Sequence, residues 1–206
     1  MDVRRTLQVS LVFILLASSL AHGAERVLVC FGDSITAGYG LEDGQSYPDA
    51  LRQLLKAEGY HYTVLNRGTS GATTKDAVDS LNSILSLHPS AVIVEFGGND
   101  GLRGLPLEQT SRNLNQILTS LQAAHVRVLL AGITLPPNYG PDYIKSFQQL
   151  YRIVAARHHV AFVPMIYKDL INVPSTIQAD GIHPTAKGSK ILANSLLPAL
   201  KPLLVR

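Results

Sequence analysis

A serine near one end of the chain and an aspartate–histidine pair near the other are the residues whose types and spacing can do chemistry. Ser34 follows the apolar run at 26–31. Asp180 precedes His183 by three positions, and the neighbouring glycine and proline favour a turn that lets the carboxylate reach the imidazole. His183 would take the Ser34 proton while Asp180 holds the other ring nitrogen. The pattern predicts nucleophilic catalysis by Ser34.

A glycine-rich segment adds groups that can stabilise negative charge. Residues 97–100 read GGND, and the Asn99 amide on such a turn can donate to a tetrahedral oxyanion, as can the backbone N–H groups of Gly71 and Ser34. Each feature alone also fits an ordinary role, namely a capping serine, a solvated loop pair or a glycine turn. At average residue usage the three patterns occur together in fewer than about one chain in a thousand. Their combination indicates a serine hydrolase.

Strands and helices alternate along the chain, and they must position these residues. Helical spacing of apolar residues predicts helices at 47–58, 73–87, 107–124, 142–158 and 185–200. Short apolar runs predict five strands, at 26–31, 61–65, 91–96, 126–133 and 160–164. The alternation predicts one α/β domain, with three α/β/α layers around a central five-stranded parallel sheet.

The polar clusters fall where the first three predicted strands end. Residues 32–34 follow the first strand, 66–71 the second and 97–100 the third. Ligands of open parallel sheets bind outside the carboxyl ends of the strands. We therefore expect these three loops to converge on one rim of the sheet.

The N-terminal 23 residues have the order of a secretory signal peptide. Arg4 and Arg5 precede an apolar run at 7–20, which ends in small residues. Cleavage is expected after Ala21 or after Gly23, leaving a single domain at 24–206 and a periplasmic or secreted protein. The alternative is a retained anchor, but the run falls short of the roughly 20 residues that a membrane span needs.

Composition limits the partners and cofactors. Hydrophobic residues make up 46% and charged residues 16%, which is a globular balance. Loss of Asp2, Arg4 and Arg5 would change the net charge from +3 to about +2, and no basic run is present, so we expect no nucleic-acid partner. Cys30 is single and cannot form an internal disulfide; a buried strand position is expected. The remaining histidines fit loop or capping positions. No metal-site spacing or nucleotide loop is present, so neither a metal nor an organic cofactor is expected.

Four blocks of the sequence resemble those of the GDSL, or SGNH, hydrolases. They are residues 32–35 (GDSI, with Ile35 in place of leucine), Gly71, residues 97–100 and residues 180–183. The stretches 37–41, 98–104 and 135–140 are similar to the bacterial periplasmic acyl-CoA thioesterase, lysophospholipase and arylesterase subfamily. The resemblance covers almost the whole mature chain.

The resemblance implies a flavodoxin-like fold with Ser34 as nucleophile, His183 as base and Asp180 as its orienter. The oxyanion hole would consist of Ser34, Gly71 and Asn99. The loop after the Asn-Asp pair borders the acyl chain in this family, which makes three residues the expected substrate contacts: Leu102, Leu105 and Pro136.

The expected reaction is acyl transfer through an acyl-Ser34 intermediate to water. Substrates would be carboxylic esters and thioesters, including lysophospholipids, fatty acyl esters and aryl esters. The enzyme is expected to be a monomer that makes transient contact with a membrane surface. An acetylated carbohydrate is an alternative substrate. Sugar rings commonly stack on aromatic side chains, and the absence of tryptophan together with an aromatic content of only 6% counts against such a site. A non-catalytic binding protein and a nucleotide-binding module are further alternatives. The intact Ser, His, Asp and Asn positions argue against the first, and the Asp33 carboxylate argues against phosphate there.

Overall fold

A parallel sheet of five strands runs through the middle of the molecule. In the computed structural model, which describes residues 26–206, the spatial order is β2-β1-β3-β4-β5 and every neighbouring pair is parallel. The predicted signal peptide lies outside the described residues. The strands are β1 (Arg26–Gly32), β2 (Tyr62–Gly68), β3 (Ala91–Glu95), β4 (Arg127–Ala131) and β5 (Ala161–Val163).

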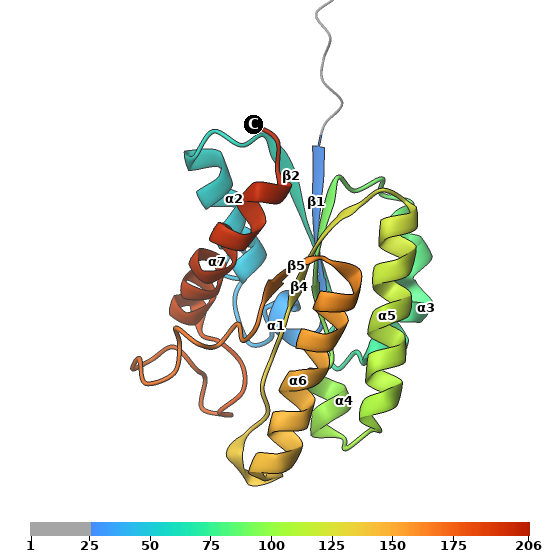
Figure 1. The fold of residues 1–206 in the computed structure, drawn as a ribbon. Helices are drawn as coiled ribbons and strands as arrows, with labels where there is room; N and C mark the ends of the chain where they lie inside the picture. The colour runs from blue at the N-terminus through green and yellow to red at the C-terminus, as the bar shows by residue number, and fades with distance from the viewer. Residues whose placement is uncertain (1–25) are drawn as a thin grey trace, which may run out of the picture.

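Helices cover both faces of this sheet (Figure 1). On one face α2 (Tyr47–Ala57) packs against α7 (Ala186–Leu200). On the other, α5 (Leu107–Ala123) lies between α3 (Thr74–Leu85) and α6 (Pro141–His158). The predicted α/β/α architecture and its five-stranded parallel sheet are therefore confirmed. The order reverses at β1, whose neighbours are β2 and β3, and ligands bind at such a reversal in open parallel sheets.

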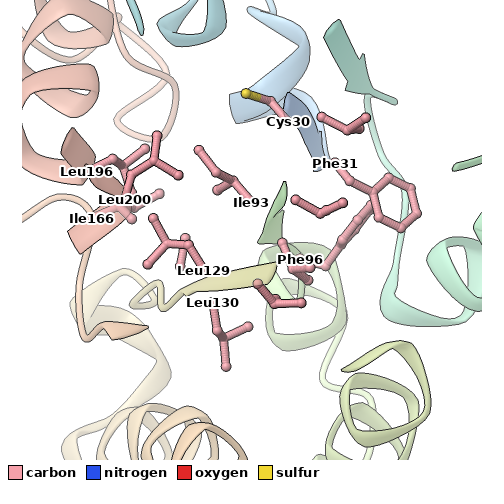
Figure 2. Close-up of a cluster of buried hydrophobic side chains, with 14 of the residues drawn as sticks. Cys30, Phe31, Ile93, Phe96, Leu129, Leu130, Ile166, Leu196 and Leu200 are labelled. Atoms are coloured by element: carbon pink, nitrogen blue, oxygen red, sulfur yellow. The ribbon is translucent and has the colours of Figure 1, made fainter. Parts of the chain in front are cut away.

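The core forms because strands buried on both faces carry apolar side chains in succession. All five residues of β3 are buried. Figure 2 shows how neighbouring residues of β4 divide between the faces: Leu129 lies toward Leu196, Leu200 and Ile166, whereas Leu130 points the other way. Side-chain alternation thus ties both helical layers to one sheet.

Cys30 and the histidines outside the predicted site lie where the sequence indicated. Cys30 is fully buried in β1, and burial raises the pKa of its thiol to about 12. His88, His125 and His159 each have a positive φ, at or just after the ends of helices or next to the following strand. Within residues 26–206, none of the helices combines the length and apolarity that crossing a bilayer requires.

Two parts of the predicted element pattern need correction. Residues 66–68 were expected in the loop after the second strand, but they extend β2, because their backbone pairs with residues 30–32 of β1. Two short helices, α1 (Ser34–Ala37) and α4 (Gly98–Leu102), were not predicted, since four or five residues are too few for a periodic signal. The same holds for the 3₁₀ turns Pro137–Tyr139 and Lys201–Leu203.

Truncation of Leu129 tests this description of the core. Leu129 is completely buried. Leu129→Ala is expected to lower the free energy of unfolding by about 2–5 kcal/mol, because lost apolar contacts and a residual cavity add. Urea denaturation followed by circular dichroism measures the change. Ile153→Ala, on the exposed side of α6, is the matched control and should change stability by less than about 0.5 kcal/mol. Equal effects of the two substitutions would contradict the described packing.

Candidate active site

Ser34 is placed at the rim of the sheet by the residue before it. Asp33 is the N-cap of α1, and its Oδ1 accepts a hydrogen bond from the backbone N–H of Ile35 at 3.0 Å. The cap ends β1 and begins the helix at Ser34. Ser34 is 9% exposed and lines a cavity at the carboxyl end of the strand.

His183 and Asp180 join Ser34 from the far end of the chain. The Nε2 atom of His183 lies 2.8 Å from Ser34 Oγ, across 149 positions of sequence. Its Nδ1 atom lies 2.7 Å from Asp180 Oδ2. A serine hydroxyl, an imidazole and a carboxylate in this order form the arrangement that activates a serine nucleophile.

The turn that carries Asp180 holds its own geometry. Asp180 Oδ1 accepts the backbone N–H groups of Ile182 at 2.9 Å and His183 at 3.0 Å. Partial burial alone would raise the pKa of Asp180, but the hydrogen bond from the His183 ring and these two N–H bonds outweigh it. The pKa of Asp180 therefore lies below its ordinary value. One oxygen fixes the backbone turn, which leaves the other to orient the imidazole.

Gly71 and Asn99 line the same cavity as Ser34. Asn99 Nδ2 donates to the Ala72 carbonyl at 3.0 Å and to Asp33 Oδ2 at 3.2 Å. Among residues 26–206, no acceptor bonds to the backbone N–H of Ser34 or of Gly71. Ser34, Gly71 and Asn99 thus lie in the wall of one cavity, where oxyanion stabilisation would need their donors.

Two glycines make this arrangement possible. Gly97, between β3 and α4, has φ of +114°, and a Cβ there would collide with the Tyr151 hydroxyl. That hydroxyl, on α6, donates to the Phe96 carbonyl and so holds the turn that leads to Asn99. Gly71 has φ of +80°, a left-handed conformation that L-residues with side chains disfavour.

The loops of Gly71 and Asn99 are bonded to each other. Arg103, just after α4, donates to the Gly71 carbonyl at 2.8 Å. The buried Asp100 carboxylate accepts the backbone N–H of Thr74 at 2.9 Å and also its hydroxyl. These bonds fix the distance between the two loops.

A cavity of about 730 Å³ opens beside these groups. Its wall is predominantly apolar and includes Leu102, Ile133, Leu135, Ile144, Met165 and Ile177. Gln148 and Thr134 supply polar atoms, but they bond to each other at 2.7 Å. The wall suits a hydrocarbon chain. Among residues 26–206, no three His, Cys, Asp or Glu side chains are grouped so that they would hold a metal ion.

The structure brings together the residues predicted for catalysis and for the oxyanion hole. Of the three residues predicted to contact substrate, it places two at the cavity and one away from it. Leu102 and Pro136 line the cavity. Leu105 does not: Gly104, with φ of +63°, turns the chain after α4, and the Leu105 N–H bonds to the Asp100 carbonyl. Loop position alone suggested Leu105, and it does not reveal such a turn.

Two residues beside the site escaped sequence reasoning. The Gln178 amide donates to the Tyr39 carbonyl at 2.7 Å and to the Pro184 carbonyl at 2.9 Å, so it joins the segment after Ser34 to the segment of His183. The Tyr39 ring lies beside the His183 ring, with centroids 4.6 Å apart and the ring planes tilted by 41°. A glutamine five positions before a histidine carries no recognisable pattern. Tyr39 belongs to the stretch 37–41 that carries the subfamily resemblance, but that stretch does not indicate contact with His183.

Comparison with known proteins gives a consistent picture. The sequence profile of the GDSL-like Lipase/Acylhydrolase family matches residues 30–191. The chain is 41% identical to Esterase TesA of Pseudomonas aeruginosa, over 89% of this chain and 92% of that protein. It is 34% identical to Thioesterase 1/protease 1/lysophospholipase L1 of Escherichia coli K12, over 93% of this chain and 90% of that protein. The crystal structure of TesA superposes with a TM-score of 0.84 and 41% identity, covering 87% of this chain and 100% of that one.

Loss of the Gln178 amide tests whether this bridge sets the geometry of the site. Gln178→Glu keeps the size of the side chain but removes both N–H donors. We expect kcat for a p-nitrophenyl ester to fall by about tenfold, the equivalent of one net hydrogen bond in the reacting geometry. Gln122→Glu, which loses a donor to the His158 carbonyl away from the site, should leave kcat unchanged. An unaltered kcat in Gln178→Glu would show that the bridge is dispensable.

Proposed function

The chain belongs to the GDSL-like lipase/acylhydrolase family, and we propose that it hydrolyses carboxylic esters and thioesters through an acyl enzyme formed on Ser34. The observation that carries this proposal is the continuous chain of contacts from Asp180 through His183 to Ser34 at the wall of an apolar cavity. The relatives named esterase and thioesterase/lysophospholipase support the same class of reaction.

In the acylation step, Ser34 Oγ attacks the carbonyl carbon while its proton passes to His183 Nε2. Asp180, bonded to Nδ1, stabilises the resulting imidazolium. The N–H groups of Ser34 and Gly71 and the Asn99 amide donate hydrogen bonds to the former carbonyl oxygen and stabilise its negative charge. The imidazolium then returns its proton to the departing alcohol or thiol, and the bond to that group breaks.

Deacylation repeats these steps with water as the nucleophile. His183 takes a proton from water as it attacks the acyl-Ser34 carbonyl, and the same donors stabilise the second tetrahedral intermediate. Ser34 then leaves with the proton held by His183. The His183 side chain is 15% exposed, so water reaches this ring from the surface.

The substrate class follows from the cavity wall. An acyl chain beside Leu102, Ile133 and Met165 would be removed from water, at about 25 cal/mol per Å² of apolar surface. Lysophospholipids, fatty acyl esters and aryl esters are therefore the proposed substrates, with Leu102 and Pro136 as contacts. A small acetyl group would leave most of the cavity unfilled, which disfavours the acetylated-carbohydrate alternative.

Export and partners belong to the same proposal. The basic and apolar order of residues 1–23 supports a cleaved signal peptide and a periplasmic or secreted enzyme. A monomer acting on small ester substrates, without nucleic acid, agrees with the modest net charge. Tyr39 and Ile171 are exposed, and both line the cavity, so they offer apolar contacts for transient approach to a lipid surface.

Removing the nucleophile tests the reaction. Ser34→Ala is expected to abolish hydrolysis of p-nitrophenyl esters while leaving the thermal unfolding midpoint near that of the wild type. Both proteins, as the mature chain, would be assayed with chain lengths from acetyl to palmitoyl. Wild-type activity should be greatest with medium or long chains, and a fluorophosphonate should label the wild type alone.

The same series separates the alternatives. Turnover by Ser34→Ala at the wild-type rate would exclude Ser34 as nucleophile. Wild-type activity limited to acetyl esters would favour a carbohydrate acetylesterase. A folded wild type that neither hydrolyses any ester nor reacts with the phosphonate would favour the binding-protein alternative.

Removal of the Asn99 amide tests the oxyanion hole. Asn99→Ala is expected to lower kcat by about 10- to 1,000-fold, the range for losing one such donor. KM should change little, because the cavity wall that holds the acyl chain is not altered. Steady-state kinetics with the preferred p-nitrophenyl ester measure both constants, and an unchanged kcat would remove Asn99 from this role.

A further inference from the structure

A second acidic residue lies beneath the site, and the reaction described above does not use it. Glu95, the last residue of β3, is 1% exposed. Its Oε2 accepts the Thr36 hydroxyl at 2.8 Å. Its Oε1 is fully buried, and among residues 26–206 no ordinary donor bonds to it. An unpaired carboxylate oxygen in such a position would be costly.

The Asp33 side chain provides the hydrogen-bond partner that the buried Glu95 carboxyl lacks. The carboxyl groups of Glu95 and Asp33 are close enough to hydrogen-bond to each other, which two carboxylates cannot do, so one of them must carry a proton. Each carboxyl accepts from two other donors: Asp33 from the Ile35 N–H and the Asn99 amide, and Glu95 from the Thr36 hydroxyl and the Asp33 N–H. The His183 ring favours the charged form of Asp33 and is not among the principal groups acting on Glu95, so Asp33 retains the charge.

The other groups acting on this pair agree with that assignment. Burial raises the pKa of both carboxyls, and the charge of Asp33 raises that of Glu95 further. Neither lysine nor arginine is among the principal groups acting on Glu95 in the described part of the chain. The hydroxyls of Tyr47, Tyr151 and Tyr167 also lie near the pair and are neutral, because burial raises their pKa. Of the two remaining titratable groups, His183 lowers the pKa of Asp33 and Asp100 raises it.

We propose that Glu95 is a positioning residue, which is protonated in the working enzyme and donates its proton to Asp33 so that Asp33 holds the Asn99 amide in the oxyanion hole. Tyr47 lies 3.1 Å from the Thr36 hydroxyl. The donors then run in one direction, from Tyr47 to Thr36, to Glu95 and to Asp33. Asp33 accepts from both this chain and Asn99, and the bonds along the chain strengthen one another because Thr36 and Glu95 each accept and donate.

The consequence for catalysis arises from the two amide hydrogens of Asn99. One bonds to the Ala72 carbonyl, and the other to Asp33 Oδ2 at 3.2 Å, the longer of the two bonds. With the proton on Glu95, Asp33 stays ionised and accepts this hydrogen, which fixes the orientation of the amide. The Asn99 side chain is then already in place when negative charge develops beside Ser34.

Kinetics of matched Glu95 variants test this role, which rests on the proposed function of Ser34. Glu95→Gln keeps the size and a donor toward Asp33, and it should retain kcat within about threefold. Glu95→Met keeps the volume but removes the donor. Its kcat should fall by about 10- to 100-fold, part of the effect of losing the oxyanion donor itself, with KM within about twofold. Unfolding midpoints measured in parallel ensure that both variants are assayed folded.

Infrared spectroscopy tests the proton directly and needs no enzymatic activity. At about pH 8, where ordinary carboxyls are ionised, the wild type should show the carbonyl stretch of a protonated carboxyl, and Glu95→Gln should lack it. Asp100→Asn is the matched control, because Asp100 is equally buried but accepts from Thr74 and Thr110. The band should persist in that variant.

Each outcome bears on a separate statement. If the band is absent from the wild type, or persists in Glu95→Gln, the proton is not on Glu95 and the proposal fails. Wild-type kcat in Glu95→Met, or an equal loss in Glu95→Gln and Glu95→Met, would overturn the positioning role. Failure of the esterase proposal would appear instead as wild-type turnover by Ser34→Ala, whatever the infrared result.

Discussion

A carboxylate buried at the end of a central strand is the constraint on which the rest of the site depends. Asp33 ends β1, caps α1 through the Ile35 N–H and holds the Asn99 amide. Burial raises its pKa, to about 6. Charge in such a place is tolerated only when several donors converge on it. The placement of the nucleophile and of the oxyanion donor therefore share one anchor, and neither can move independently of the other.

The remaining geometry comes from ties between segments that are distant in sequence. The parallel sheet brings the ends of β1, β2 and β3 to one edge, but a shared edge fixes positions only approximately. Arg103 bonded to Gly71 and Gln178 bonded to Tyr39 set the final distances. Catalytic geometry requires precision well below the tolerance of strand packing. Polar side chains with fixed hydrogen-bond directions supply it here.

The features that could be predicted from the sequence are those encoded by the periodicity of apolar residues and by rare combinations of catalytic residue types. Strand and helix order, the five-stranded sheet and the burial of Cys30 follow from apolar patterns, and the structure gathers Ser34, Asp180 and His183 as their residue types suggested. The extension of β2 depends on pairing with β1, which leaves no mark on residue type. The turn before Leu105 depends on the positive φ of Gly104, which a glycine permits but does not by itself predict.

Glu95 illustrates a further reason why a site escapes prediction. An acidic residue that ends an apolar strand reads as the polar boundary of that strand, and sequence alone does not reveal that it is buried. The role proposed for Glu95 depends on its hydrogen bonds with Thr36 and Asp33, which belong to a different segment of the chain. The protonation state of a buried carboxyl can be inferred only when its hydrogen-bond donors and acceptors are known.

The two sides of the site rely on different physical effects. Asp180 is 37% exposed, so solvent screens its charge, and its contribution depends mainly on holding the His183 ring in one orientation. On the oxyanion side Gly71 and Asn99 are half-buried, but the carboxyls of Asp33 and Glu95 behind Asn99 are buried, where electrostatic interactions act in a low dielectric. A base near the surface and donors beside a buried strand end fit their tasks: the base must exchange protons with water and leaving groups, whereas the donors must remain where charge develops.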